Sequence, residues 1–207
     1  MEKKFNEQDS LKLINEMITQ AKNNFQKGAG NSIIFWGYSI ASIAILNIVL
    51  LYIMPQPRYS FWIWTLTIPL SVISRIVERK REKEVSVRSH FDRIISRTWH
   101  GFLISVVVTL STIFLSVYCT KTWTLCILIT PILLILTGLA QYITGIASRF
   151  TPFVIGGYTF WCGAVLSILI LLVSSSSTAQ FVILAISMIF GFIAPGHMLN
   201  KKAEQNV

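Results

Sequence analysis

Six long apolar runs, separated by short polar connections, dominate the pattern of the chain. They cover roughly residues 32–54, 61–77, 101–120, 123–147, 154–173 and 181–198. None contains Asp, Glu or Lys, and the only Arg is Arg75, near the end of the second run. About 20 helical residues, rising about 1.5 Å each, cross a hydrocarbon core of about 30 Å. The runs lack the alternation of membrane β-strands, so we expect six transmembrane helices.

The lengths of the connections predict how these helices pair. Connections 55–60, 121–122 and 174–180 are short, which favours three antiparallel helical hairpins. The second helix of each hairpin contains one proline, at Pro69, Pro131 or Pro195. Proline removes a helical hydrogen bond and can kink a span. The predicted fold is therefore an all-α integral membrane protein; whether its hairpins enclose a cavity stays open.

The distribution of charge predicts the orientation in the membrane. The 207-residue chain has 18 Lys and Arg against nine Asp and Glu, a formal net charge of +9. Sixteen of the 18 bases fall on one side: five before the first run, eight around the second connection, one in the fourth connection and two after the last run. Only Arg58 and Lys121 lie on the other side. The positive-inside rule then places both termini in the cytoplasm.

This topology also accounts for the basic excess without a nucleic-acid partner. Neither cytoplasmic segment resembles a nucleic-acid recognition module, so we expect the lipid bilayer, not DNA or RNA, as the partner. The expected location is the bacterial cytoplasmic (inner) membrane, as a multi-pass protein.

The polar segment 1–30 is predicted to form an amphipathic cytoplasmic helix. Its apolar side chains recur three and four residues apart, which places them on one helical face: Leu11, Ile14, Ala21, Ile18 and Phe25. The segment has a net charge of only +1, whereas helices that lie on anionic lipid are usually more basic. We therefore expect the face of Leu11, Ile14, Ile18 and Phe25 to dock on protein, with the inner membrane surface as the alternative.

The connection 78–100 is predicted to be helical as well. Its first part carries mixed charges that suit a solvated extension of the second span, and its second part has an apolar stripe on which the N-terminal helix could pack. Residues 201–207 form a short cytoplasmic tail. Together these segments would make a small cytoplasmic cap, which either packs within the chain or docks a partner.

Composition and the search for reactive groups both argue against an enzyme. Hydrophobic residues make up 53% and charged residues 13%, about half the charge of a soluble protein. We find no nucleophile–base pair, metal motif or phosphate-binding loop, and we expect no catalytic residue, cofactor or metal. Cys119 and Cys126 flank the third connection, and whether they are bridged is open. The strongest polar groups within the runs are Asn47 and Gln141, expected to bond between helices or to line a solute path.

Three stretches resemble a group of uncharacterised six-span bacterial inner-membrane proteins with a polar N-terminal helix. They are Phe35-Trp36-Gly37-Tyr38, residues 149–158 with Trp161, and residues 191–197, which contain a Gly-aromatic-Ile-x-Pro-Gly motif. The resemblance implies a six-span fold, but no activity and no catalytic residues.

Two functions follow from these patterns. The leading one is a non-enzymatic membrane protein that binds or regulates a protein partner through its cytoplasmic helices. The alternative is a small permease or channel for a neutral or apolar solute, because transporters often contain repeated hairpins and no intramembrane carboxylate is present to couple ions. Homo-oligomers fit either function.

Overall fold

The structure, a computed structural model, describes residues 30–84, 90–174 and 177–205, and every element among them is helical. Six helical spans are long and apolar enough to cross a membrane: Asn31–Ile53, Tyr59–Lys80, Arg93–Thr120, Trp123–Ala147, Thr151–Ile170 and Thr178–Gln205. They match the six apolar runs and confirm the expected all-helical, multi-pass class. The predicted docking face of Leu11, Ile14, Ile18 and Phe25 lies outside the described residues.

The spans are not all single α-helices. In chain order the elements are α2 (Asn31–Ile53), the 3₁₀-helix η1 (Pro57–Leu66), α3 (Thr67–Glu84), α4 (His90–Thr120), the 3₁₀-helix η2 (Trp123–Leu128), α5 (Ile129–Ala147), α6 (Thr151–Ser174), α7 (Ser177–Met188), the π-helix η3 (Ile189–Ile193) and α8 (Ala194–Gln205).

The second span begins with ten residues of 3₁₀-helix, which the apolar pattern did not predict. Runs of this helix beyond three or four residues are uncommon. Proline lacks an N–H group, so Pro69, just after η1, removes the α-helical donor for the carbonyl of Thr65. Thr65 and Thr67 donate their hydroxyls to the carbonyls of Trp62 and Trp64, each at 2.7 Å. The carbonyl of Thr65 itself accepts from the backbone N–H of Thr67, which also donates to the carbonyl of Trp64.

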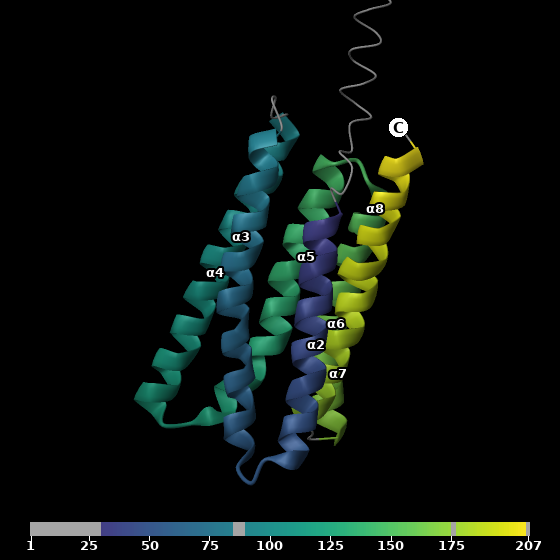
Figure 1. Cartoon of the computed structure of the whole chain (residues 1–207). Coiled ribbons are helices and arrows are strands. Elements are labelled where there is room, and N and C mark those ends of the chain that lie inside the picture. The colour runs from purple at the N-terminus through teal and green to yellow at the C-terminus, as the bar shows by residue number, and fades with distance from the viewer. Residues whose placement is uncertain (1–29, 85–89, 175–176, 206–207) are drawn as a thin grey trace, which may run out of the picture.

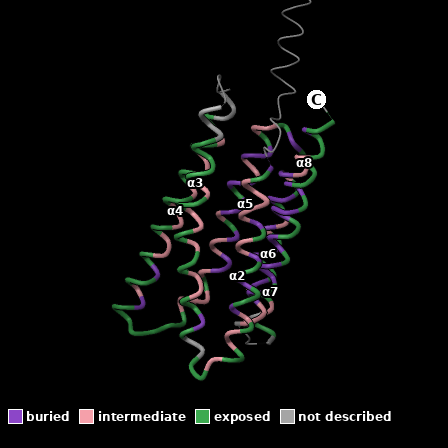
Figure 2. The backbone as a smooth tube through the Cα atoms, in the orientation of Figure 1, coloured by how far each residue is buried: buried purple, intermediate pink, exposed green. Residues whose placement is uncertain are grey.

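Four spans form a packed bundle, and the other two lie along one side of it. Figure 1 shows α2, α5, α6 and the α7–α8 span together, with α3 and α4 beside them. Buried residues are concentrated in the bundle (Figure 2). In an apolar stretch of 18 residues of the last span 61% of the residues are buried, against 11% in the corresponding stretches of the second and third spans. The α7–α8 span is therefore the centre of the fold.

Glycines allow the helices of the bundle to approach closely. A Cβ atom added to Gly156 of α6 would lie 2.6 Å from the carbonyl oxygen of Gly191 in η3, and one added to Gly138 of α5 would lie 3.0 Å from the carbonyl oxygen of Gly157. Between these contacts the core is filled by large apolar side chains, and Phe160 and Leu134 have no exposed surface. Small residues commonly have this role where membrane helices cross.

The first and last described residues lie at the same end of the molecule (Figure 1). There the backbone N–H of Gly30 donates to Oδ1 of Asn200 at 3.0 Å, and Nδ2 of Asn200 donates to Oδ1 of Asn31 at 2.6 Å. We refer to this side as the Asn200 end. The C-terminal ends of α2, α4 and α6 lie at the opposite end (Figure 1).

Candidate functional site

The interior of the bundle contains uncharged polar side chains. Among the described residues, the buried polar ones are Asn47, Ser60, Thr130, Thr137, Gln141, Thr144, Ser167, Gln180 and Ser187. Three of the six buried hydroxyls, those of Thr137, Thr144 and Ser167, are bonded to backbone carbonyls of their own helices, each at 2.7 Å. The three amide side chains bond to other elements, and they define the candidate site.

Gln141 of α5 joins this helix to the central span. Its side chain has no exposed surface, and its Nε2 donates to the carbonyl oxygen of Gly191 at 3.1 Å. Pro195, four residues later, has no N–H group and cannot give the carbonyl of Gly191 the donor that an α-helix would supply. The Oε1 atom of Gln141 has no hydrogen-bond partner. A buried acceptor left unpaired costs about 1–3 kcal/mol.

Gln180 of α7 makes the reverse connection, from the central span to η2 at the start of the fourth span. Its Nε2 donates to the carbonyl oxygen of Ile127 at 3.3 Å. Pro131 follows Ile127 by four residues and likewise lacks the N–H group that an α-helix would supply. The fourth and sixth spans thus each contain a proline, and in each the carbonyl four residues before that proline accepts a hydrogen bond from a glutamine of the other span.

Asn47 lies apart from this pair, on α2 opposite the start of the second span. Its side chain has no exposed surface, and its Oδ1 accepts a hydrogen bond from the hydroxyl of Ser60 at 3.3 Å. Its Nδ2 has no partner. The structure therefore does not join Asn47 and Gln141 by a hydrogen bond, and each has a different partner helix.

The surroundings of Gln141 leave little space for a solute in this conformation. A Cβ atom on Gly191 would collide with the ring of Phe160, which itself packs on Phe192 with ring centroids 4.9 Å apart. None of the buried polar side chains in the described parts of the chain can ionise. The described residues also contain no group of three His, Cys, Asp or Glu side chains able to hold a metal ion. What the site offers is neutral amide dipoles.

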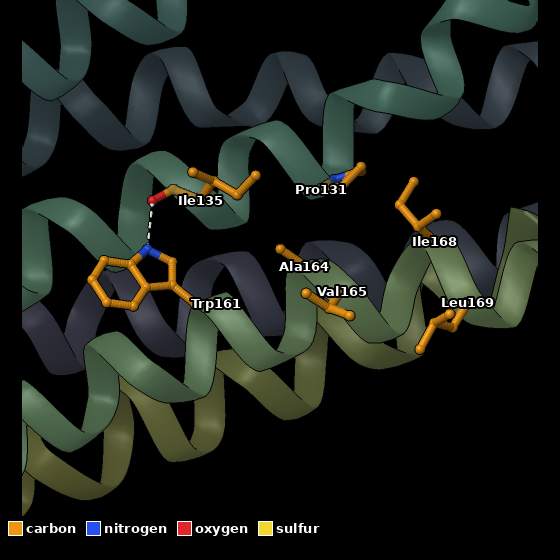
Figure 3. A pocket seen from close by; sticks show the side chains of 7 residues that line it. All are labelled: Pro131, Ile135, Trp161, Ala164, Val165, Ile168 and Leu169. Carbon is orange, nitrogen blue, oxygen red and sulfur yellow. Dashed lines mark hydrogen bonds between the residues drawn. The ribbon is translucent and has the colours of Figure 1, made fainter.

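An apolar groove lies on the outside of the bundle, between α5 and α6 (Figure 3). It has a volume of about 400 Å³, and the side chains of Pro131, Ile135, Val165 and Leu169 are among its walls. The indole N–H of Trp161 points to the carbonyl oxygen of Ile135 and donates to it at 3.2 Å. This bond uses the polar group of Trp161, so the groove presents an apolar surface.

At the Asn200 end, polar contacts hold α3 against α2. The hydroxyl of Ser32 donates to Oε1 of Glu78 at 2.9 Å, and the indole N–H of Trp36 donates to the hydroxyl of Ser74 at 3.2 Å. These contacts connect the start of the first span to the charged end of the second.

A further contact at this end joins α3 to α4. Nη2 of Arg75 lies 3.0 Å from Nε2 of His100, and Nδ1 of His100 lies 2.7 Å from the carbonyl oxygen of Ser96. Nδ1 therefore carries the proton and Nε2 accepts from the guanidinium, because a guanidinium only donates. The neighbouring Trp99 packs on Phe192, with ring centroids 5.9 Å apart. This ring contact joins α4 to η3 of the central span.

At the opposite end, both thiols of Cys119 and Cys126 are free, so the structure does not bridge them. Lys121, in the turn between them, has a left-handed backbone with φ of 56°. Its ammonium lies 4.2 Å from the centre of the Tyr118 ring, and this cation–π contact keeps the charge next to an aromatic side chain.

Sequence reasoning identified Asn47 and Gln141 but missed Gln180 and Asn200. A usable signal for Gln180 was present in the sequence: a proline in a span identifies the carbonyl four residues earlier as one that needs a donor. No comparable signal pointed to Asn200, because its partners are backbone and side-chain atoms about 170 residues away.

Comparisons with known proteins add no assignment: no family model, no curated protein and no solved structure matches the chain. The resemblance to six-span inner-membrane proteins therefore rests on the three sequence stretches alone.

Proposed function

We propose that the chain is a non-enzymatic protein of the bacterial inner membrane, with three antiparallel hairpins and both termini in the cytoplasm, that binds or regulates a protein partner at its cytoplasmic face. In this topology the Asn200 end faces the cytoplasm. The excess of Lys and Arg in the segments attached to that end supports this orientation.

One observation carries the proposal: α3 and α4 extend beyond their apolar parts as charged helices at the Asn200 end. Glu78, Arg79 and Lys80 on α3 are exposed, and so are Arg93 and Arg97 on α4. Rigid helices that present charged side chains of both signs form a surface suited to a protein partner, because charge complementarity favours specificity and rapid association. The membrane part, in contrast, offers neutral amides and apolar grooves.

Affinity capture of the full-length protein from native membranes tests this function. We expect the double substitution Arg79→Glu with Lys80→Glu to lose at least one protein that the wild type retains. Lys121→Asn is the matched control, since it removes a charge at the opposite end and asparagine tolerates the left-handed backbone found there. Identical protein lists for the wild type, the double variant and a chain that begins at Gly28 would contradict the proposal.

A small permease or channel for a neutral solute is the second candidate. The unpaired buried atoms Nδ2 of Asn47 and Oε1 of Gln141 favour it, because either could bind a polar solute group in another conformation. The close packing around Gly191 weighs against passage through a single subunit in the present conformation. Solute uptake into proteoliposomes tests it: flux that both Asn47→Leu and Gln141→Leu abolish would support transport, and the absence of flux above protein-free vesicles would exclude it for the solutes tested.

A further inference from the structure

The central span (Thr178–Gln205) contains an irregular segment next to Gln141. The π-helix η3 (Ile189–Ile193) separates α7 from α8. Short π-segments inside membrane and soluble helices disturb the regular ladder and are frequent at functional sites. Gly191 lies in the middle of η3, and Pro195 follows one turn later. The segment therefore contains one residue that weakens a helix and is followed closely by another.

Gln141 is the polar side chain that restrains this segment from another helix. Its Nε2 donates to the carbonyl of Gly191, but its Oε1 is buried and unpaired. The conformation described therefore leaves one hydrogen bond of Gln141 unmade. A second conformation of the segment that supplied a donor to Oε1 would gain that bond.

The part of the molecule beyond η3 is tied to the first span, and Leu199 of α8 also packs with Phe150 and Phe153 at the start of α6. The buried Gly196 of α8 lies against Ile34 of α2, and Asn200 bonds to both Gly30 and Asn31. A turn of α8 about η3 would therefore carry the beginning of α2 with it.

We propose that η3 is a joint at which α8, together with the beginning of α2, turns relative to the rest of the bundle, and that Gln141 is the positioning residue that holds this joint. The joint is a property of the membrane helices, and it does not require a bound partner. Through this joint, a change within the buried part of the bundle would move the Asn200 end, where the polypeptide continues into residues 1–29.

The size of the motion follows from helix geometry. Ten residues separate Gly191 from Lys201, which makes a lever arm of about 15 Å. A bend of about 20°, the smallest that counts as a sharp kink, would move Lys201 sideways by about 5 Å. Displacements of this size are measurable between spin labels.

The test uses the full chain with Cys119, Cys126 and Cys162 replaced by serine. Spin labels are placed on the exposed positions Ile146→Cys of α5 and Lys201→Cys of α8. The Gln141→Leu variant should show a second distance, or a shifted one, that differs from that of the parent chain by up to about 5 Å. Gln180→Leu is the matched control, because it removes the same kind of glutamine–carbonyl bond at Ile127, away from η3, and it should retain the parent distance.

Two further measurements separate a joint from general loosening. A second label pair, Val107→Cys on α4 and Ile155→Cys on α6, avoids the central span and should give the same distance in all variants. Deletion of the exposed Phe190 removes the extra residue of the π-segment, and in the Gln141→Leu background it should restore a single distance. An unchanged Lys201 distance in Gln141→Leu, an equal change in Gln180→Leu, or a change in the second pair as large as in the first would overturn the proposal.

Discussion

The substitution Gly156→Ala tests the close contact between α6 and η3, on which the packing of the central span depends. Its new Cβ atom would lie 2.6 Å from the carbonyl oxygen of Gly191 and 3.3 Å from the Cα and carbonyl carbon of the same residue. All three are backbone atoms, so no side chain can rotate away. Ordinary contact begins near 3.4 Å, and the two backbones would therefore have to separate by about 0.8 Å, the difference between 3.4 and 2.6.

The energetic consequence has two opposing parts. Overpacking of a filled core costs about 1–3 kcal/mol, whereas replacing glycine by alanine inside a helix stabilises by about 0.5–1 kcal/mol. We expect Gly156→Ala to lower the free energy of unfolding by about 1–2 kcal/mol. Gly101→Ala on α4 is the matched control, because a Cβ atom there meets no atom within 4 Å. That variant should be neutral or slightly stabilised.

The assay is reversible unfolding of the purified protein in mixed micelles, followed by tryptophan fluorescence and circular dichroism. The informative quantity is the difference between the two alanine variants, since both gain the same helix propensity. A Gly156→Ala protein as stable as Gly101→Ala would refute the inferred contact between α6 and the π-segment.

Three further predictions use the same unfolding assay or hydrogen exchange. Gln141→Leu and Gln180→Leu should each lower the free energy of unfolding by about 0.6–1.7 kcal/mol. The double variant should show the sum of the two losses, because the two bonds lie at different carbonyls. A coupling energy above about 0.5 kcal/mol would argue against independent contacts. Asn200→Ala should speed amide exchange at Gly30, while Asn200→Asp, which keeps an acceptor oxygen, should preserve protection; equal exchange in both variants would show that this bond is unimportant. Asn47→Leu should cost less than about 1 kcal/mol, because it removes a buried donor that has no partner, and a loss above about 2 kcal/mol would show that the amide is fully bonded.

The membrane spans were predictable from the sequence because their signal is local. Each apolar run is close to the length of a membrane-crossing helix, and only the second contains a charged residue, Arg75 near its end. The segments where the spans depart from regular α-helix were harder to predict. Pro69 indicated a disturbance in the second span, but a single proline does not predict the ten residues of 3₁₀-helix before it.

The candidate site was predictable in part for a similar reason. Gln141 was noticeable as a strong polar group in an apolar run, and the carbonyls at Gly191 and Ile127 follow from the positions of Pro195 and Pro131. The pairing of each glutamine with the proline of the other span depends on which helices are neighbours in space, and the order of residues along the chain does not contain this information. The π-helix η3 and the hydrogen bonds of Asn200 with Gly30 and Asn31 likewise depend on the tertiary structure.

Membrane orientation is the premise on which the proposed function depends most, and cysteine labelling in intact cells measures it directly. The free thiol of Cys119 at the opposite end is a native reporter, and Lys80→Cys on the exposed extension of α3 reports on the Asn200 end. A membrane-impermeant maleimide added outside, after the outer barrier is opened, should modify Cys119 and leave Lys80→Cys unmodified until the inner membrane is lysed. Modification of Lys80→Cys in intact inner membranes would contradict the account, because the charged helices would then face away from the cytoplasm.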